Sequence, residues 1–241
     1  MKTLLRTISF AIAFIFAFHL QAQDISFGIK TGIQSANVKV PGFIDDISQV
    51  PDFKSITTFN IGVVSEIGLH ENFAIQPELA FTQKGFKIKE GMDLSLFGVQ
   101  LPVGVVAVSK FNYLEMPLLA KAKFGNEKSK FYLLAGPTFG YAMNGKLDTR
   151  AKVLVEIDLF ETPIDLDAVG YERWEVGGMA GAGVSIGTGN GSQLFFDVRY
   201  THGFTQPYDI PVVRERVQHN SLGVNIGFTM PFGGKTTTPR A

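Results

Sequence analysis

Two histidines in the last third of the sequence lie near an acid and a hydroxyl, a combination that could support hydrolytic chemistry. His202 and His219 are accompanied by Asp197 and Ser221. Nucleophilic catalysis requires a histidine within hydrogen-bond reach of both the nucleophile and an orienting acid. If residues 193–204 form a strand, His202 and Asp197 point to opposite faces, because their positions differ by an odd number. We therefore expect no catalytic triad and no enzyme.

Metal chemistry also lacks its usual patterns. The histidines after residue 22 are His70, His202 and His219. They form no H-x-H or H-E-x-x-H spacing, which argues against a zinc site. Asp45-Asp46 and Asp165-x-Asp167 lack the glycine-containing loop of a calcium site, and solvated loop acids explain them better. We expect no metal and no cofactor.

The spaced glycines Gly187, Gly189 and Gly191 invite comparison with a phosphate-binding loop. Such a loop precedes a helix whose N-terminus holds the anion, and it contains a Gly-Lys-Ser/Thr sequence. Neither feature follows these glycines. Residues 188–192, Thr-Gly-Asn-Gly-Ser, have instead the composition of a tight hairpin turn.

The elements that must position any site are eight segments in which apolar and polar residues alternate with a period of two, as in β-strands. They are residues 24–35, 57–69, 73–86, 110–124, 130–143, 174–187, 193–204 and 220–232. The last segment places Leu222, Val224 and Ile226 on one face, and Gly223 and Asn225 on the other. Each segment is long enough for the roughly 9–11 residues that a tilted membrane strand needs.

The polar faces of these segments carry charges of both signs in nearly equal number. They are Lys30, Glu66, Glu78, Glu115, Lys121, Lys123, Glu175, Asp197 and Arg199. In a closed barrel within lipid, these charges would all point into one narrow lumen, where opposite signs pair. Glycines such as Gly183 and Gly227 share the inward parity and leave room for long side chains. The charges predict an ion-paired, closed lumen and not an open pore.

The connections alternate in length, which gives a second argument for a barrel. The long ones are residues 36–56, 87–109, 144–173 and 205–219, and the short ones are residues 70–72, 125–129 and 188–192. Outer-membrane barrels have long extracellular loops and short periplasmic turns, whereas Greek-key sandwiches have no such regular alternation. We expect an all-β fold, an eight-stranded antiparallel up-and-down transmembrane β-barrel with long extracellular loops and short periplasmic turns.

The N-terminus has the form of a cleaved signal peptide over residues 1–22. Lys2 and Arg6 precede an apolar run, residues 8–20, that ends just before Ala22 and Gln23. The run is shorter than the roughly 20 residues of a membrane-spanning helix. We expect export to the outer membrane, with a barrel domain over residues 23–232 and a short tail over residues 233–241.

The composition limits the classes of partner and of stabilising bond. The chain has 22 basic and 22 acidic residues, so its charge balance gives no reason to expect a nucleic-acid partner. It contains no cysteine, which excludes disulfides and thiolate metal sites. Stability must come from strand pairing and from packing, and outer-membrane lipid is the expected surrounding.

Residues 111–121, Phe-Asn-Tyr-Leu-Glu-Met-Pro-Leu-Leu-Ala-Lys, resemble the Tyr-Leu-Glu-Ile-Pro-Leu strand of the PorT-like outer-membrane β-barrel family of Bacteroidetes. Further likeness is found in residues 28–32, residues 77–79 and residues 133–137, so the resemblance follows the whole chain after the signal peptide. It implies an eight-stranded barrel, and the founding member of the family is linked to protein export by the type IX secretion machinery. The nine residues after Phe232 depart from barrels that end on an aromatic residue.

Taken together, these features favour a structural or interaction protein with a closed lumen, and the family resemblance implies a link to protein secretion. The long connections at residues 87–109 and 144–173 contain apolar runs, and we expect a secretion-machinery or extracellular partner to bind there. The apolar runs have three alternative explanations: they could extend the strands, pack as a lid, or form the partner surface itself. Two other functions stay open, a small transport channel and an enzyme that modifies lipid A.

Overall fold

The structure is a computed structural model that describes residues 24–39, 53–96, 99–126, 128–152, 156–205, 207 and 218–232. The expected signal peptide and C-terminal tail lie outside these described residues. The same is true of Asp45 and Asp46, and of most of the connection at residues 205–219.

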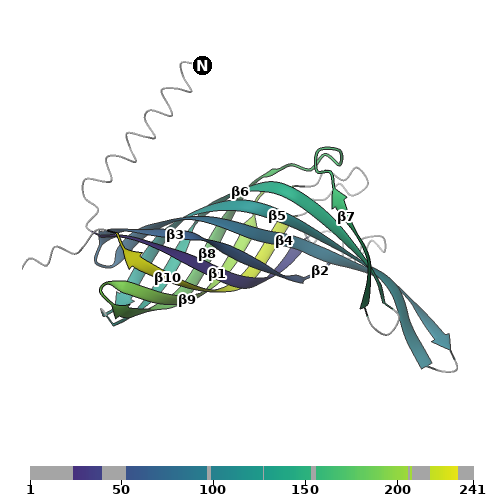
Figure 1. Cartoon of the computed structure of the whole chain (residues 1–241), viewed down its shortest axis with the longest axis horizontal. Helices are drawn as coiled ribbons and strands as arrows, with labels where there is room; N and C mark the ends of the chain where they lie inside the picture. The colour runs from purple at the N-terminus through teal and green to yellow at the C-terminus, as the bar shows by residue number, and fades with distance from the viewer. Residues whose placement is uncertain are drawn as a thin grey trace, which may run out of the picture.

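The described residues are almost entirely strand (Figure 1). The strands are β1 (Asp24–Lys39), β2 (Phe53–Lys54), β3 (Ile56–His70), β4 (Phe73–Leu96), β5 (Val99–Gly125), β6 (Ser129–Lys152), β7 (Glu156–Ile164), β8 (Trp174–Gly189), β9 (Ser192–Gly203) and β10 (Gln218–Pro231). No helix among the described residues has the length and apolar character needed to cross a membrane.

Eight of these strands close into an antiparallel barrel. Neighbours follow the order β4-β3-β1-β10-β9-β8-β6-β5, and β5 pairs again with β4. The closing pair of chain ends, β1 and β10, is in register from Ser26↔Pro231 to Lys39↔Gln218. Because a closed sheet has no edge, its peptide groups are satisfied within the wall, as lipid requires. The expectation of an eight-stranded up-and-down barrel is confirmed.

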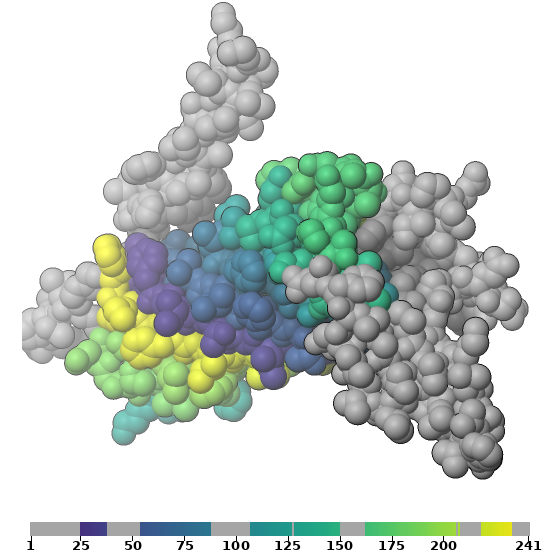
Figure 2. All heavy atoms as spheres, turned by 45° about the vertical axis from the view of Figure 1, so that its right-hand side comes forward, coloured from purple at the N-terminus to yellow at the C-terminus, as the bar shows by residue number. Residues whose placement is uncertain are grey.

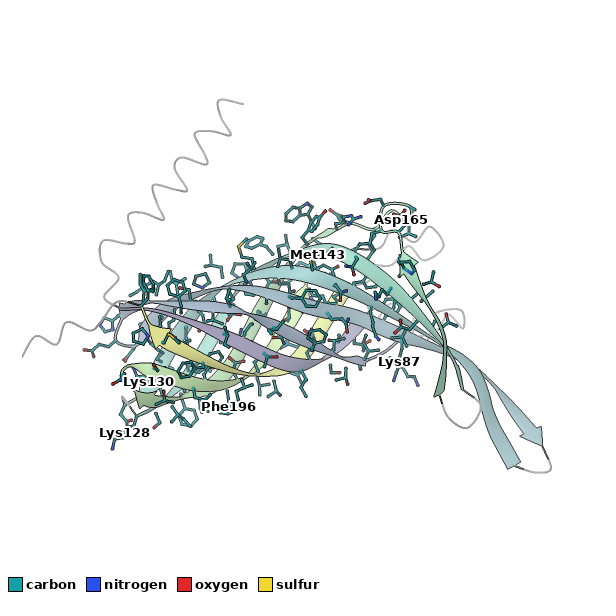
Figure 3. The ribbon with its side chains drawn as sticks, viewed as in Figure 1. Lys87, Lys128, Lys130, Met143, Asp165 and Phe196 are labelled. Atoms are coloured by element: carbon teal, nitrogen blue, oxygen red, sulfur yellow. The ribbon has the colours of Figure 1, made fainter. Side chains whose placement is uncertain are left out.

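The alternation of polar and apolar residues in the sequence corresponds to the inner and outer faces of the barrel wall. On β10, Leu222, Val224 and Ile226 are exposed on the outer wall, while Gly223 and Asn225 are buried. Other strands repeat this pattern, and Phe196 is labelled on the outer surface in Figure 3. The apolar band suits hydrocarbon, and the inner wall is where polar groups gather.

The two rims of the barrel differ as the connection lengths predict. Short turns join β3 to β4, β5 to β6 and β8 to β9, and the described chain ends lie on the same rim, where the Phe232 amide donates to the Ile25 carbonyl at 2.7 Å. In the β8–β9 turn, Asn190 and Gly191 have φ of 52° and 78°, the left-handed backbone that asparagine and glycine tolerate.

At the opposite rim, the expected strand ends are wrong, because the strands continue well beyond them. β4 and β5 pair as far as Leu96↔Val99, so residues 87–109 are mainly a hairpin and not a loop. β6 runs to Lys152 and pairs with β7, which places strands in most of residues 144–164. β1 also continues to Lys39. Strand pairing continues beyond the length that a membrane strand needs, and alternation in the sequence does not mark where it stops. Figure 1 shows these extensions at its right-hand end.

Candidate functional site: the ion-paired lumen

The centre of the lumen is crossed by a network that we call the central tier: Lys30, Glu78, Asp197 and Arg199. Arg199 on β9 donates from Nη1 to the two oxygens of Glu78 at 2.8 and 2.9 Å. Its Nε and Nη2 donate to Asp197, both at 2.7 Å. Lys30 on β1 also pairs with Glu78, and the Tyr132 hydroxyl of β6 donates to Asp197 at 2.9 Å. The tier thus joins β1, β4, β6 and β9 across the barrel.

Nearer the short-turn rim lies a second network, the lower tier, formed by Glu66, Lys121 and Lys123. Lys121 and Lys123 on β5 each donate to one oxygen of Glu66 on β3, both at 2.8 Å. The Lys121 ammonium also lies 4.1 Å from the ring centroid of Tyr132 and 5.8 Å from that of Phe195. The aromatic faces help to stabilise a cation that is almost fully buried.

On the extracellular side of the centre lies the upper tier, formed by Lys84, Glu115, Glu175 and His219. The Lys84 ammonium lies 2.6 Å from a carboxylate oxygen of Glu115 and 2.6 Å from one of Glu175. His219 Nδ1 lies 2.9 Å from the other oxygen of Glu175. Lys84 also stands 4.7 Å above the ring of Tyr113. These groups come from β4, β5, β8 and β10, so this tier too spans the lumen.

The three tiers balance in charge. Their cations are Lys30, Lys84, Lys121, Lys123 and Arg199, and their carboxylates are Glu66, Glu78, Glu115, Glu175 and Asp197. Equal numbers of opposite charges at hydrogen-bond distance compensate the large desolvation cost of burying them. A small cavity near the upper tier has a volume of about 10 Å³, room for about one water molecule. Side chains therefore fill the lumen.

Glycines provide the space for these side chains. A Cβ atom at Gly183 would stand 2.6 Å from the Tyr132 ring and 2.6 Å from Asp197 Cβ. One at Gly227 would stand 2.2 Å from the Phe195 ring. Both glycines face the tiers, where a larger residue would displace an aromatic ring that contacts Lys121.

All nine charged residues that the sequence pattern assigns to the lumen take part in these tiers. The list lacked Lys84, although Lys84 shares the inward parity of Glu78, so counting along β4 was enough to find it. His219, the last residue of the expected connection at residues 205–219, lies instead in the upper tier and is buried. Because β10 already begins at Gln218, His219 has the inward parity of Ser221 and Gly223.

Three of the hydrolytic candidates bind other side chains. Asp197 binds Arg199, His219 binds Glu175, and His202 Nδ1 contacts the side chain of Asn220. Among the described residues, no cluster of three or more histidine, aspartate or glutamate side chains has the arrangement of a metal site.

The mouth of the lumen is filled by residues that no pattern in the sequence assigns to it. β8 and then β7 pair with one edge of β6, up to Tyr141↔Trp174 and from Gly145↔Ile164 onward. Residues 165–173 therefore bulge from what is otherwise one continuous line of pairing with β6; we call them the inserted turn. Figure 2 shows this region, in green, as a bulge on the barrel, and Figure 3 labels Asp165 at its start.

The inserted turn is held by its own bonds and by bonds to neighbouring segments: the Ala142 amide donates to the Arg173 carbonyl at 2.8 Å, and the Glu172 amide donates to the Pro207 carbonyl at 3.0 Å. Asp165 Oδ1 accepts from the amides of Asp167 and Ala168 at 3.1 and 3.2 Å, and Gly170 adopts φ of 66°. Arg173 donates twice to the Asp167 carboxylate at 2.8 Å, and this bonding lowers the pKa of Asp167. The acids expected as solvated loop residues thus shape the turn. Asp165, Gly170 and the pair Asp167 and Arg173 are the residues in the sequence that could have indicated an ordered turn here.

Two side chains of the inserted turn reach inward. Tyr171 stacks on Phe111, with ring centroids 4.9 Å apart and planes 15° apart, and its hydroxyl is hydrogen-bonded to that of Tyr113. Leu166 is 2% exposed and packs in the same cluster, against Phe111. The mouth of the lumen is thus closed by apolar and aromatic groups above the upper tier.

Comparison with known proteins gives one family match. A model described as the outer membrane protein beta-barrel domain matches residues 21–208, more than half of the chain. No curated protein sequence matches.

Among solved structures, similar chains include the attachment invasion locus protein Ail of Yersinia pestis, with 15% identity, a TM-score of 0.38, and coverage of 85% of this chain and 98% of that one. Neisserial surface protein A has 14% identity and a TM-score of 0.45, with coverage of 86% and 97%. OprG from Pseudomonas aeruginosa has 14% identity and a TM-score of 0.41, with coverage of 87% and 96%.

Proposed function

Because the chain belongs to the outer membrane protein beta-barrel domain family, we propose that it is a non-conducting outer-membrane protein whose strand extensions bind a partner at the cell surface. The observation that carries this proposal is the lumen, where three tiers, whose charges balance when taken together, join opposite walls. An ion crossing the barrel would have to separate these buried pairs, at a cost of several kcal/mol for each charge left without its partner.

The binding surface in this proposal is the extended sheet that β4, β5, β6 and β7 form beyond the lipid. β5 has 27 residues, whereas β9 has 12, and a membrane strand needs only roughly 9–11. The excess length supports a role outside the bilayer, since strands that served only to span it would end at the rim. Residues 87–109 and 144–173 supply this sheet and the inserted turn.

The resemblance of residues 111–121 to the PorT-like family favours a component of the protein-secretion machinery as the partner. No catalytic step belongs to this proposal, because Asp197, the acid that the sequence pattern offers, is bound by Arg199, and His202 Nδ1 contacts Asn220.

Conductance in planar bilayers tests the closed lumen. We expect the full chain, folded as judged by heat-modifiable gel mobility, to give no conductance steps. As a matched control, Lys84→Ala together with Glu175→Ala removes long side chains from the upper tier while keeping its net charge. Discrete steps from the wild-type protein would contradict the proposal and favour the channel alternative.

Crosslinking in cells tests the binding surface. Glu90 and Val105 face each other in register, so Asn-Gly in place of residues 91–104 shortens the β4–β5 hairpin with a turn that fits two antiparallel strands. We expect wild-type protein to crosslink to a secretion component and the shortened protein to lose that adduct while still reaching the outer membrane. Identical adducts would reject the extended sheet as the binding surface, and an altered lipid A in cells lacking the protein would favour the enzyme alternative.

A further inference from the structure

On the outer wall near the extracellular rim, a polar cluster ends the apolar band. We call it the amide cluster: Tyr200 and His202 of β9 and Asn220 of β10. His202 and Asn220 stand opposite each other in register, and both have the outward parity of the exposed residues Tyr200 and Leu222. Phe196, on the same face of β9, is labelled on the outer surface in Figure 3. The cluster therefore faces the surroundings of the barrel and not the lumen.

One hydrogen-bond donor of the amide cluster lacks an acceptor. Asn220 Oδ1 accepts from the Tyr200 hydroxyl at 3.2 Å, and His202 Nδ1 contacts the same oxygen. Asn220 is 6% exposed, and its buried Nδ2 has no partner among the described residues. Buried donors are almost always paired, so this one indicates an acceptor that is not part of the described chain.

A second row of outward amides shows what the amide cluster lacks. On β4, β5 and β6, Gln83 Nε2 donates to Asn112 Oδ1 at 3.1 Å, and Asn112 Nδ2 donates to Asn144 Oδ1 at 2.7 Å. Asn112 and Asn220 each stand where the exposed apolar residues of their strand end, but only the Asn112 donor is paired within the wall. The acceptor for Asn220 must come from the medium around the barrel.

That medium is the headgroup layer of the outer leaflet. Aromatic residues favour the membrane interface, and they gather around the amide cluster. Tyr200 stacks on His202 with ring centroids 6.4 Å apart, and Phe204 meets the same imidazole edge-on at 5.5 Å. His202 is only half-buried, and side chains at such positions change rotamer within nanoseconds. A headgroup can thus reach the Asn220 amide while the barrel wall stays closed.

The chemistry of the headgroup follows from what the cluster offers. An amide N–H donates, and an imidazole can hold a proton on both nitrogens and carry a positive charge. The outward positions of β1, β9 and β10 contain no acidic residue that would repel an anion. Of the groups in a lipid headgroup, phosphate is both anionic and an acceptor, so it matches the cluster best.

We propose that the amide cluster binds the phosphate group of an outer-leaflet lipid of the lipid A type. In the bound state, a phosphate oxygen accepts from Asn220 Nδ2, and the His202 imidazolium donates from Nε2 to the same group. The site lies on β9 and β10, away from the ionic tiers and from the extended sheet. It therefore goes beyond the proposed function and does not depend on it.

Native mass spectrometry of the full chain in a maltoside detergent, which contains no phosphate, tests this site. Hexa-acyl lipid A and its dephosphorylated form are titrated, and the bound fraction gives an apparent Kd for each. Wild-type protein should bind lipid A about tenfold more tightly than the dephosphorylated lipid, as expected for charge-assisted hydrogen bonds to one group. Asn220→Leu removes the donor and continues the outward apolar row of Leu222, so it should lose most of this preference. His202→Gln cannot carry the positive charge and should reduce the preference about threefold.

Asn112→Leu is the matched control, because it removes an outward amide whose donor is already paired, and it should keep the preference for lipid A. Heat-modifiable gel mobility shows that each variant is folded, and Asn220→Asp, which replaces the donor with a negative charge, serves if Asn220→Leu does not fold. Two results would overturn the phosphate site. The first is equal affinity of wild-type protein for both lipids, which would mean that the apolar wall alone binds lipid. The second is a preference that the folded Asn220 variant retains. Both leave the conductance and crosslinking results of the proposed function unaffected.

Discussion

The lumen is filled in two different ways, by ionic tiers within the membrane-spanning part and by an aromatic cluster at the mouth. In the central tier every group comes from a barrel strand, so Arg199 cannot leave without exposing Glu78 and Asp197. At the mouth, Tyr171 comes from an insertion that is bonded both within itself and to neighbouring segments at Ala142 and Pro207. The difference indicates that the seal in the middle is built by the barrel strands themselves, whereas the seal at the mouth is built by an insertion between two of them.

The largest effect is expected from breaking the central tier. Arg199→Ala leaves two buried carboxylates short of partners, so we expect the free energy of unfolding to fall by about 3–5 kcal/mol. Urea unfolding in lipid vesicles measures it, with the single tryptophan, Trp174 on the outer wall, as the fluorescent probe. Lys128→Ala, at an exposed rim position, serves as the control and should change stability by less than about 0.5 kcal/mol. An Arg199→Ala effect no larger than this control would show that the tier does not stabilise the barrel.

A pair of tyrosines compares the two regions directly. Tyr132 and Tyr171 are both nearly fully buried, at 2% and 5% exposure. Tyr132→Ala should cost about 3–5 kcal/mol of global stability, as expected for a buried aromatic residue. Tyr171→Ala should cost under about 1 kcal/mol, because the inserted turn can open without unfolding the barrel. Equal losses in urea unfolding would mean that Tyr171 at the mouth contributes as much to the stability of the barrel as Tyr132 in its middle.

A smaller effect is expected from filling the space that a glycine leaves. Gly183→Ala forces a methyl group against Tyr132 and Asp197, and overpacking of this kind costs about 1–3 kcal/mol. Gly178→Ala, on the outer face, is the matched control: its nearest neighbour is the Phe204 ring at 3.0 Å, which can turn toward lipid. The same vesicle assay should show the larger loss for Gly183→Ala, and a reversed order would contradict the tight fit of the lower lumen.

The smallest effect concerns pH at the inserted turn. The hydrogen bonds from Arg173 lower the pKa of Asp167, so the pair stabilises the closed turn at neutral pH. This contribution is lost as pH falls below the ordinary aspartate value of about 4 and through the lowered one. Acrylamide quenching of Trp174, which adjoins Arg173, should increase about twofold over this range. Asp167→Asn should give a flat profile, and a wild-type profile that is equally flat would show that the pair does not hold the turn.

The wall of the barrel could be read from the chain itself, because a strand has a strict period of two and lipid demands one apolar face. Leu222, Val224 and Ile226 lie outward as their spacing predicts, and the nine charges assigned to the lumen take part in its tiers. Short turns carry their own signature in residues such as Asn190 and Gly191. These are local properties, so the sequence was sufficient to determine them.

What only the tertiary structure decided is which charges meet and what closes the mouth. Glu78 lies 121 positions from Arg199, and their pairing follows from the order of the strands around the barrel and from their stagger, neither of which is encoded in the spacing of residues along one strand. The position of Tyr171 on Phe111 depends on β7 and β8 sharing one edge of β6, so that the residues between them form an insertion from which Leu166 and Tyr171 reach the mouth. Local alternation fixes the face of each residue, whereas contacts across the lumen arise only when the sheet closes.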